Sequence, residues 1–171
     1  MEAIITTIVA TRTALYSDSY CNTSHPFGTQ KLYKVSHKKS GDEFLMGGAG
    51  YLSDIVYFAR LLAEHGLQDL WKLHQGEHWP PKIMKQFDSD ILVVTREKEI
   101  FLVDKTLVPM PVIDKKAYCI GSGGDWASAY LELVADATIE GAIEYAAKRD
   151  ENTKAPIHRI SFGRKRPEDP E

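Results

Sequence analysis

The chain opens with two segments whose apolar and polar positions are typical of β-strands. AIITTIVA (3–10) is rich in β-branched residues, and ALYSDSYC (14–21) alternates between apolar and polar positions. Together they predict a β-hairpin that turns near Arg12. A turn centred on that residue places Thr6 opposite Asp18, since both are six positions away from it.

The next apolar segments predict a second strand pair and a helix. KLYKV (31–35) and EFLMG (43–47) are expected to be strands, because HKKSGD between them consists of turn-forming residues. Apolar side chains then recur at helical spacing after Ser53, a candidate N-cap, as far as Gly66, where the helix is expected to end. A shorter helix is expected between Gly66 and the proline pair at 80–81.

The second half of the chain predicts a hairpin, two helices and a final strand. DILVVTREKEIFLVD (90–104) contains two apolar strands around a charged turn. KAYCIGSGG (116–124) predicts a strand that ends in a glycine turn, DWASAYLELVA (125–135) and TIEGAIEYAAKRD (138–150) predict helices, and PIHRISF (156–162) predicts the last strand. Strands and helices in separate blocks indicate an α+β fold with antiparallel sheets rather than alternating βαβ units.

Composition and charge restrict the classes of function. The 171 residues suffice for one domain with a substantial core, which we place at 1–163, followed by a polar tail at 164–171 that we expect to be disordered. A net charge of −3 argues against nucleic acid and anionic membranes as partners. No segment reaches the roughly 18 apolar residues of a membrane helix. Two cysteines and an N-terminus unlike a secretory signal indicate a soluble, cytoplasmic protein.

Several stretches resemble, in their order along the chain, the motifs of one family. TTIV at Thr6 resembles the mature N-terminus of that family, SDS (17–19) resembles its acidic segment, and KLYKV resembles the strand that begins with its catalytic lysine. MGGAG resembles the family's oxyanion glycine turn. IGSGGDWA resembles its Gly-Ser-Gly turn with the helix that follows, and AIEYAAKRD resembles its helix that ends in Arg-Asp. From Thr6 to Phe162 the chain thus resembles the β-type subunits of proteasomes, and most closely the bacterial HslV-type peptidase, both N-terminal nucleophile hydrolases. The resemblance implies a four-layer αββα sandwich of two antiparallel sheets between helices.

The resemblance also implies a peptidase site around Thr6. A threonine hydroxyl needs a nearby base, and an N-terminal threonine has its own α-amine, which titrates at about 7.7–8.0. The family pattern implies that Lys31 lies beside the hydroxyl, that Asp18 orients Lys31, and that the backbone N–H of Gly47 stabilises the oxyanion. The implied supporting group near the amine is Ser122, Asp150 and Thr153, the last of which is serine in most of the family.

Assembly and partners follow from the same resemblance. It implies a homo-oligomeric ring, stacked in pairs, with the sites facing an inner chamber. An ATP-dependent unfoldase would deliver substrates, which would be proteins or peptides. The implied chemistry needs no cofactor and no metal ion.

Ordinary structural roles compete with each of these assignments. Thr6 is also a favourable strand residue, and Asp18 is also a reasonable turn acid. Lys31 can serve as a charge on an edge strand, and Lys34 competes with it for the catalytic position. The glycines can serve a tight turn alone, and Ser122 can cap the helix that follows it.

Two other groups of reactive residues suggest alternative sites. His74 and His78 are four apart, with Glu77 beside them, which on a helix could hold a metal ion, but a glycine interrupts the segment and no third ligand is evident. Cys21 and Cys119, together with the histidines, could indicate a cysteine hydrolase. Neither cysteine lies in a recognisable nucleophile motif, so buried thiols are the better interpretation.

The match to the family departs from its pattern at the nucleophile. Residues 1–5 precede Thr6 and form a candidate propeptide. Family members with propeptides usually have glycine before the threonine, whereas this chain has Ile5, which is β-branched and stiff. The predicted hairpin is also shorter than the family's, and an ungapped register from Asp18 puts Glu2 at the nucleophile position.

Two hypotheses from different classes therefore remain. In the first, cleavage before Thr6 exposes the nucleophile, and the protein is a threonine peptidase. In the second, the chain stays uncleaved and serves as an inactive structural or binding subunit. The set of family-like site residues favours the first hypothesis, and Ile5 favours the second.

Overall fold

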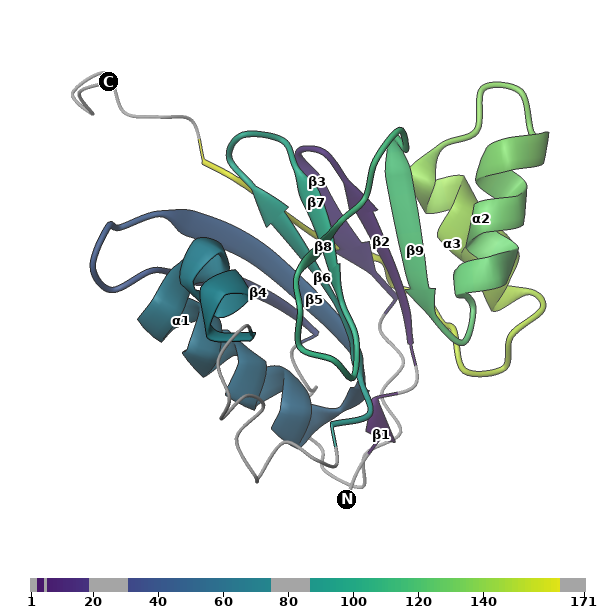
Figure 1. Cartoon of the computed structure of the whole chain (residues 1–171). Coiled ribbons are helices and arrows are strands. Elements are labelled where there is room, and N and C mark those ends of the chain that lie inside the picture. The colour runs from purple at the N-terminus through teal and green to yellow at the C-terminus, as the bar shows by residue number, and fades with distance from the viewer. Residues whose placement is uncertain (1–2, 5, 19–30, 75–86, 164–171) are drawn as a thin grey trace.

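The structure, a computed structural model, describes residues 3–4, 6–18, 31–74 and 87–163. Two antiparallel β-sheets lie face to face between helices (Figure 1). This is the α+β, four-layer arrangement expected from the sequence.

The larger sheet has the strand order β1-β5-β6-β7-β8, and β4 pairs with β5 beside this path. Its strands are β1 (Ala3–Ile4), β4 (Leu32–Ser36), β5 (Glu43–Tyr51), β6 (Asp90–Thr95), β7 (Ile100–Val103) and β8 (Met110–Pro111). The pairs β4–β5 and β6–β7 confirm the two predicted hairpins. The short strand β8 was not predicted, since two residues give no periodic pattern.

The smaller sheet has the strand order β10-β3-β2-β9. Its strands are β2 (Thr7–Thr11), β3 (Ala14–Ser17), β9 (Ala117–Gly121) and β10 (His158–Ser161). All four strands lie in segments that the sequence predicts to be extended. The central strand β2 leads directly away from Thr6, so this sheet fixes where Thr6 lies.

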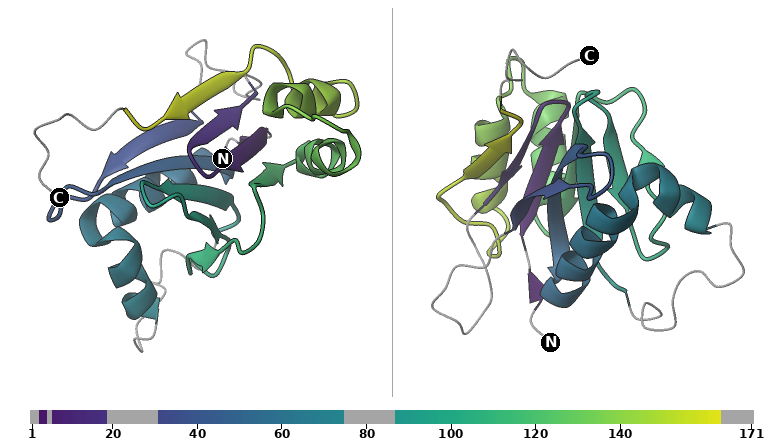
Figure 2. Two further views of the ribbon diagram at one scale, coloured as in Figure 1. Left: turned by 90° about the horizontal axis from the view of Figure 1, so that it is seen from above. Right: turned by 90° about the vertical axis from the view of Figure 1, so that its left-hand side faces the viewer.

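The helices cover the two outer faces. They are α1 (Leu52–His74), α2 (Gly124–Leu133) and α3 (Ile139–Ala147). Figures 1 and 2 show α1 against the larger sheet and the pair α2–α3 against the smaller sheet, on opposite sides of the molecule. No helix in the described part of the chain is long and apolar enough to cross a membrane.

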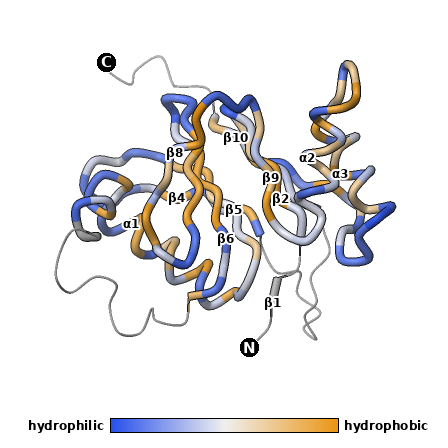
Figure 3. The backbone as a smooth tube through the Cα atoms, turned by 45° about the vertical axis from the view of Figure 1, so that its right-hand side comes forward, coloured by the Kyte–Doolittle hydropathy of each residue, from blue (hydrophilic) through white to orange (hydrophobic). Residues whose placement is uncertain are grey.

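The core consists of three apolar clusters, one between each pair of layers. The middle cluster joins the two sheets through residues such as Ile8, Leu15, Leu45 and Leu92, all fully buried. Strand alternation separates the clusters, because Val9 faces the helices α2 and α3 while its neighbour Ile8 faces the other sheet. Apolar residues accordingly dominate the central strands in Figure 3.

The first predicted hairpin is wrong by one residue in its register. Its loop is the pair Arg12–Thr13, and the amide of Asp18 donates to the carbonyl of Thr7 at 3.2 Å. Thr7, not Thr6, therefore lies opposite Asp18. The predicted first strand is also divided, because β1 pairs with β5 in the larger sheet while β2 belongs to the smaller one.

Two predicted helix caps are wrong, whereas the predicted helix end at Gly66 is confirmed. Helix α1 begins at Leu52, so Ser53 is not its N-cap. Its first helical segment ends at Gly66, where φ is 67° and ψ is 171°, and a shorter helical segment follows, as the sequence predicts. Helix α2 has Gly123 at its N-cap with no side-chain bond, so Ser122 does not cap it. The segment with the two adjacent prolines, residues 80–81, and the tail 164–171 lie outside the described residues.

Candidate active site

A buried carboxylate, that of Asp18, organises the N-terminal end of β2. Its Oδ1 accepts hydrogen bonds from the amide of Thr7 at 3.0 Å and from Lys31 Nζ at 3.1 Å, and its Oδ2 accepts one from the amide of Lys154 at 3.0 Å. The hydroxyl of Thr6 donates to the same Oδ1. Asp18 is fully buried and Lys31 is 5% exposed. The structure thus brings Thr6, Asp18 and Lys31 together, as the sequence predicts.

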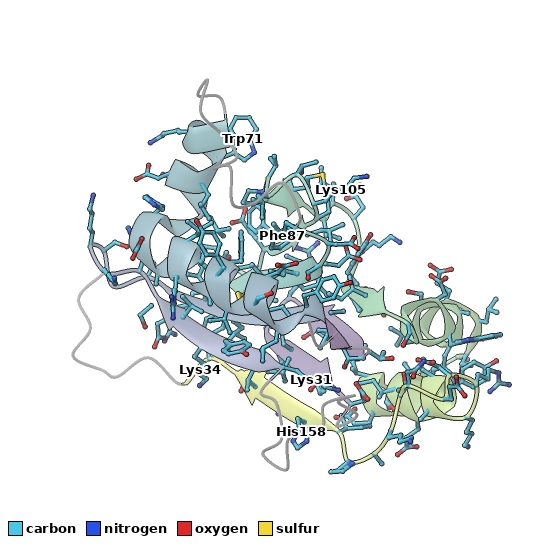
Figure 4. All side chains as sticks on the ribbon, turned by 90° about the horizontal axis from the view of Figure 1, so that it is seen from below. Lys31, Lys34, Trp71, Phe87, Lys105 and His158 are labelled. Atoms are coloured by element: carbon cyan, nitrogen blue, oxygen red, sulfur yellow. The ribbon has the colours of Figure 1, made fainter. Side chains whose placement is uncertain are left out.

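Lys31, rather than Lys34, provides the cation of this group. Lys31 lies just before β4 and is buried, whereas Lys34 within β4 is exposed (Figure 4). Strand alternation turns these two lysines toward different surroundings. A buried ion pair whose oxygens accept further hydrogen bonds fixes both charged groups in place, since exposing either alone to an apolar interior is costly.

The two adjacent threonines contact different partners. Thr6 lines an open cavity of about 440 Å³ as well as contacting Asp18. Thr7 Oγ1 instead lies 2.6 Å from Thr153 Oγ1, and Thr153 donates to Asp150 Oδ2 at 2.7 Å. A hydroxyl has one proton, so Thr7 is the donor to Thr153. Of the two, Thr6 alone lies at the cavity wall.

The predicted supporting residues Ser122, Asp150 and Thr153 form one hydrogen-bonded group. Ser122 Oγ donates to Asp150 Oδ2 at 2.5 Å, beside the bond from Thr153. Desolvation raises the pKa of Asp150, but the hydrogen bonds from Ser122, Thr153 and Asn152 outweigh it and leave the pKa below its ordinary value. The group reaches the threonine pair through Thr7 and the cavity through Ser122.

Gly47 does not lie in this site. It is in the interior of β5, paired with Leu32 and Leu92, where an added Cβ would lie 3.0 Å from side-chain atoms of Ile8 and Leu32. The segment MGGAG (46–50) is extended strand rather than the turn that the sequence suggests. Gly47 therefore packs between the sheets, away from the cavity.

Within MGGAG (46–50), the glycine that lines the cavity together with Thr6 is Gly50. It lies near the end of β5 with φ of +130°, a conformation that favours glycine. Gly121, which also lines the cavity, has φ of +87° and lies so close to the Thr6 carbonyl that a Cβ would be 1.8 Å from the oxygen. The sequence could have indicated Gly50, because it is the last glycine of MGGAG before the predicted helix, and the strand must end there.

Three carboxylates, from Asp88, Asp90 and Asp104, and the amine of Lys105 also line the cavity. Desolvation raises the pKa of Asp90, and the charges of Asp104 and Asp88 raise it further. Carboxylates outnumber the amine, so this part of the cavity favours a positively charged group. No sequence motif marks these residues, because Asp90 begins β6 while Asp88, Asp104 and Lys105 lie outside the strands, and only the fold brings them together.

The segment before Thr6 lies along the edge of the same cavity. In β1, Ala3 pairs with Tyr51 and Ile4 pairs with Gly50. The chain that precedes the candidate nucleophile therefore occupies the edge of β5 where Gly50 borders the cavity. Thr6 itself is fully buried in this arrangement.

The alternative metal and cysteine sites find no support in the described part of the chain. No group of three or more potential ligands that could hold a metal ion occurs among the described residues. The side chain of His74, together with Glu77, His78 and Cys21, lies outside the description. Burial raises the pKa of the Cys119 thiol, which keeps it protonated and unreactive.

The fold is similar to that of several solved structures. Eukaryotic HslV from Trypanosoma brucei matches with a TM-score of 0.64 and 16% identity, over 91% of this chain and 99% of that one. A Gly-1 mutant of Anbu from Hyphomicrobium sp. strain MC1 matches with a TM-score of 0.67 and 14% identity, over 92% of this chain and 81% of that one. BPH from Thiobacillus denitrificans, in complex with epoxomicin, matches with a TM-score of 0.61 and 15% identity, over 92% of this chain and 97% of that one. No protein-family model and no curated protein sequence matches the chain.

Proposed function

We propose that this chain, which has the HslV-type N-terminal nucleophile hydrolase fold, is the subunit of a threonine peptidase with Thr6 as nucleophile. The observation that supports this most is the contact of the Thr6 hydroxyl with the buried Asp18–Lys31 pair at the wall of an open cavity. A structural subunit needs no hydroxyl at that place.

Cleavage between Ile5 and Thr6 would give the hydroxyl its base. The freed α-amine accepts the hydroxyl proton while the oxygen attacks a peptide carbonyl carbon. Collapse of the tetrahedral intermediate breaks the C–N bond, and the proton passes to the leaving amine. Water then hydrolyses the ester and restores Thr6.

Lys31 and Asp18 have distinct roles in this mechanism. The ammonium of Lys31 stabilises the negative charge that develops on the Thr6 oxygen, since both contact Asp18 Oδ1. Asp18 holds the lysine and the backbone of Thr7 in place. Asp150, with Ser122 and Thr153, supports the same end of β2 through the hydroxyl of Thr7.

We assign the oxyanion donor to the backbone N–H of Gly50 in place of Gly47. Gly50 borders the cavity next to Thr6, and Gly47 does not. The residues of β1 pair with this edge, so it becomes available to a substrate strand only when they move away. Loss of one oxyanion donor typically lowers kcat by about 10²–10³-fold.

The second candidate function, an uncleaved structural or binding subunit, is favoured by β1. Its pairing with Gly50 and Tyr51 is compatible with a chain that stays intact. The stiff Ile5 also disfavours the bend that self-cleavage before Thr6 needs.

For both candidate functions we propose that the subunits assemble into a homo-oligomeric ring. For the peptidase, we propose delivery of protein substrates by an ATP-dependent unfoldase.

The test is the intact mass of protein expressed without an N-terminal tag, in wild type and in Thr6→Ala. We expect a wild-type species that begins at Thr6 and a variant that stays full-length. Thr13→Ala, in the exposed hairpin loop, is the matched control and should process like wild type. The processed protein should hydrolyse fluorogenic peptides and be inhibited by epoxomicin, the compound in the BPH complex.

An Ile5→Gly variant separates the two candidate functions. Wild-type protein that remains full-length after assembly, while Ile5→Gly cleaves itself, would assign the inactive role to the natural chain. If neither protein is processed and neither hydrolyses peptides, the peptidase proposal is wrong.

A further inference from the structure

The hydroxyl of Ser89 connects the end of β5 to the first turn of α1. Ser89 Oγ accepts a hydrogen bond from the amide of Tyr51 at 2.8 Å and donates one to Asp54 Oδ2 at 2.9 Å. The same Asp54 oxygen accepts the amide of Asp88 at 3.0 Å. Ser89 is 5% exposed, so little water competes for these bonds. Two segments distant in sequence, residues 51–54 and 88–89, thus meet at one hydroxyl.

The direction of each bond in this chain is fixed by chemistry. An ionised carboxylate only accepts, so the single proton of Ser89 points to Asp54. The lone pairs of the hydroxyl are then left for the amide of Tyr51. Because the peptide unit is planar, holding that N–H also holds the carbonyl of Gly50 in the same unit.

Ser89 also contacts Gly50 directly. A Cβ on Gly50 would lie 2.3 Å from Ser89 Oγ and 2.6 Å from Ser89 Cα, so the two residues are packed with no room for a side chain. Gly50 and Ser89 both line the cavity that contains Thr6. The serine therefore supports this edge of the cavity by packing and by a hydrogen bond.

We propose that Ser89, held by Asp54, is a positioning residue that fixes Gly50 and the Gly50–Tyr51 peptide beside Thr6. Its catalytic consequence rests on the proposed peptidase function, since a displaced Gly50 no longer stabilises the oxyanion. The positioning itself does not depend on that function. Misplacement of a catalytic group by about 1 Å can lower a rate by about 10²-fold.

The experiment compares Ser89→Ala with Thr95→Val in the processed full-length assembly. Ser89 directly precedes β6, and Thr95 is its last residue; both are 5% exposed. The hydroxyl of each accepts a hydrogen bond from a backbone amide, that of Tyr51 for Ser89 and that of Glu99, at 3.3 Å, for Thr95. Both substitutions remove one buried hydroxyl. We expect Ser89→Ala to lower kcat by about 10-fold to 100-fold with KM nearly unchanged, and Thr95→Val to keep wild-type kcat.

Asp54 provides the rescue test. Asp54→Asn keeps an oxygen that can accept from Ser89 and Asp88, so it should retain most of the activity. Asp54→Ala removes that oxygen and should lower kcat as Ser89→Ala does. A merely structural role would not separate kcat from KM in this way.

Hydrogen exchange gives a readout that needs no activity. The Tyr51 amide should exchange faster in Ser89→Ala than in wild type and be unchanged in Thr95→Val. If wild type hydrolyses no peptide, the proposed function fails while the exchange comparison still decides the positioning. Equal exchange and equal kcat in the two variants would overturn the inference. Should Ser89→Ala not fold, Ser89→Cys takes its place, because the thiol is a weaker donor and acceptor of similar size.

Discussion

At the scale of single residues, Asp150 of the supporting group and Asp90 of the cavity differ in how their ionisation affects stability. Asp150 is stabilised in its charged form by three neighbours, so its contribution to stability is present above its ordinary pKa of 3.8 and is lost as pH falls through its lower folded value. Ionisation of Asp90 has the opposite effect and destabilises the folded chain. Desolvation and the charges of Asp104 and Asp88 raise its pKa above 3.8 in the folded chain.

We expect Asp90→Asn to stabilise the protein at neutral pH. Between 3.8 and the raised value the folded chain binds more protons than the unfolded chain, so the free energy of unfolding falls as pH rises through this window. Removing the charge should raise Tm by about 1–2 °C at pH 7, and the gain should vanish below the window. Thermal unfolding of wild type and variant at several pH values measures this difference in Tm. The control is Glu97→Gln in an exposed turn, and an equal gain there would contradict the assignment.

At the scale of elements, α1 is two helical segments joined at Gly66. This glycine has φ of 67° and ψ of 171°, which is outside the helical region. An added Cβ would lie 3.4–3.5 Å from the ring of His37, so the space is filled but not overlapped. The kink lets the second segment continue and bury Leu70. Trp71, at its far end, remains half exposed (Figure 4).

We expect Gly66→Ala to destabilise the fold by about 1–3 kcal/mol, because this backbone conformation is strained for any residue with a Cβ. Urea unfolding measures the change. Gly163→Ala is the control, since no atom lies within 4 Å of where its Cβ would be and its φ is not positive. Equal effects of the two substitutions would show that the kink at Gly66 carries no such strain.

At the scale of the whole molecule, the contact between the two sheets supports the candidate site. Ile8 follows Thr7 on β2, and Leu32 follows Lys31 at the start of β4. Both belong to the middle core cluster, together with Leu45. Thr6 precedes β2 and Lys31 precedes β4, and these strands belong to different sheets, so the approach of the two residues depends on how this cluster is packed.

We expect Leu45→Ala to cost about 2–5 kcal/mol of unfolding free energy, because it leaves a cavity between the sheets. Leu133→Ala removes the same atoms from a side chain that is 84% exposed and should change stability by less than about 0.5 kcal/mol. Chemical denaturation of both variants gives the comparison. Similar values for the two would mean that the middle cluster does not hold the sheets together.

The sequence predicted most elements and part of the site. The hairpin of β6 and β7 and the helix α3 were predicted correctly, because their apolar periods and turn residues are local. The family-like motifs also identified Asp18, Lys31, Ser122, Asp150 and Thr153, which the structure brings near the two threonines. The domain limits 1–163 and the catalytic roles remain predictions.

The tertiary structure alone decided the details on which the proposed catalysis depends. It set Thr7 rather than Thr6 opposite Asp18, took β1 into the other sheet, and put Gly50 rather than Gly47 at the cavity. A shift of one residue leaves a strand pattern unchanged in the sequence but turns each side chain to the other face. The sequence by itself therefore determined which segments are strands and helices and which reactive residues accompany them. Pairing between distant strands determined which of these residues meet, because that choice depends on packing energy and not on local pattern.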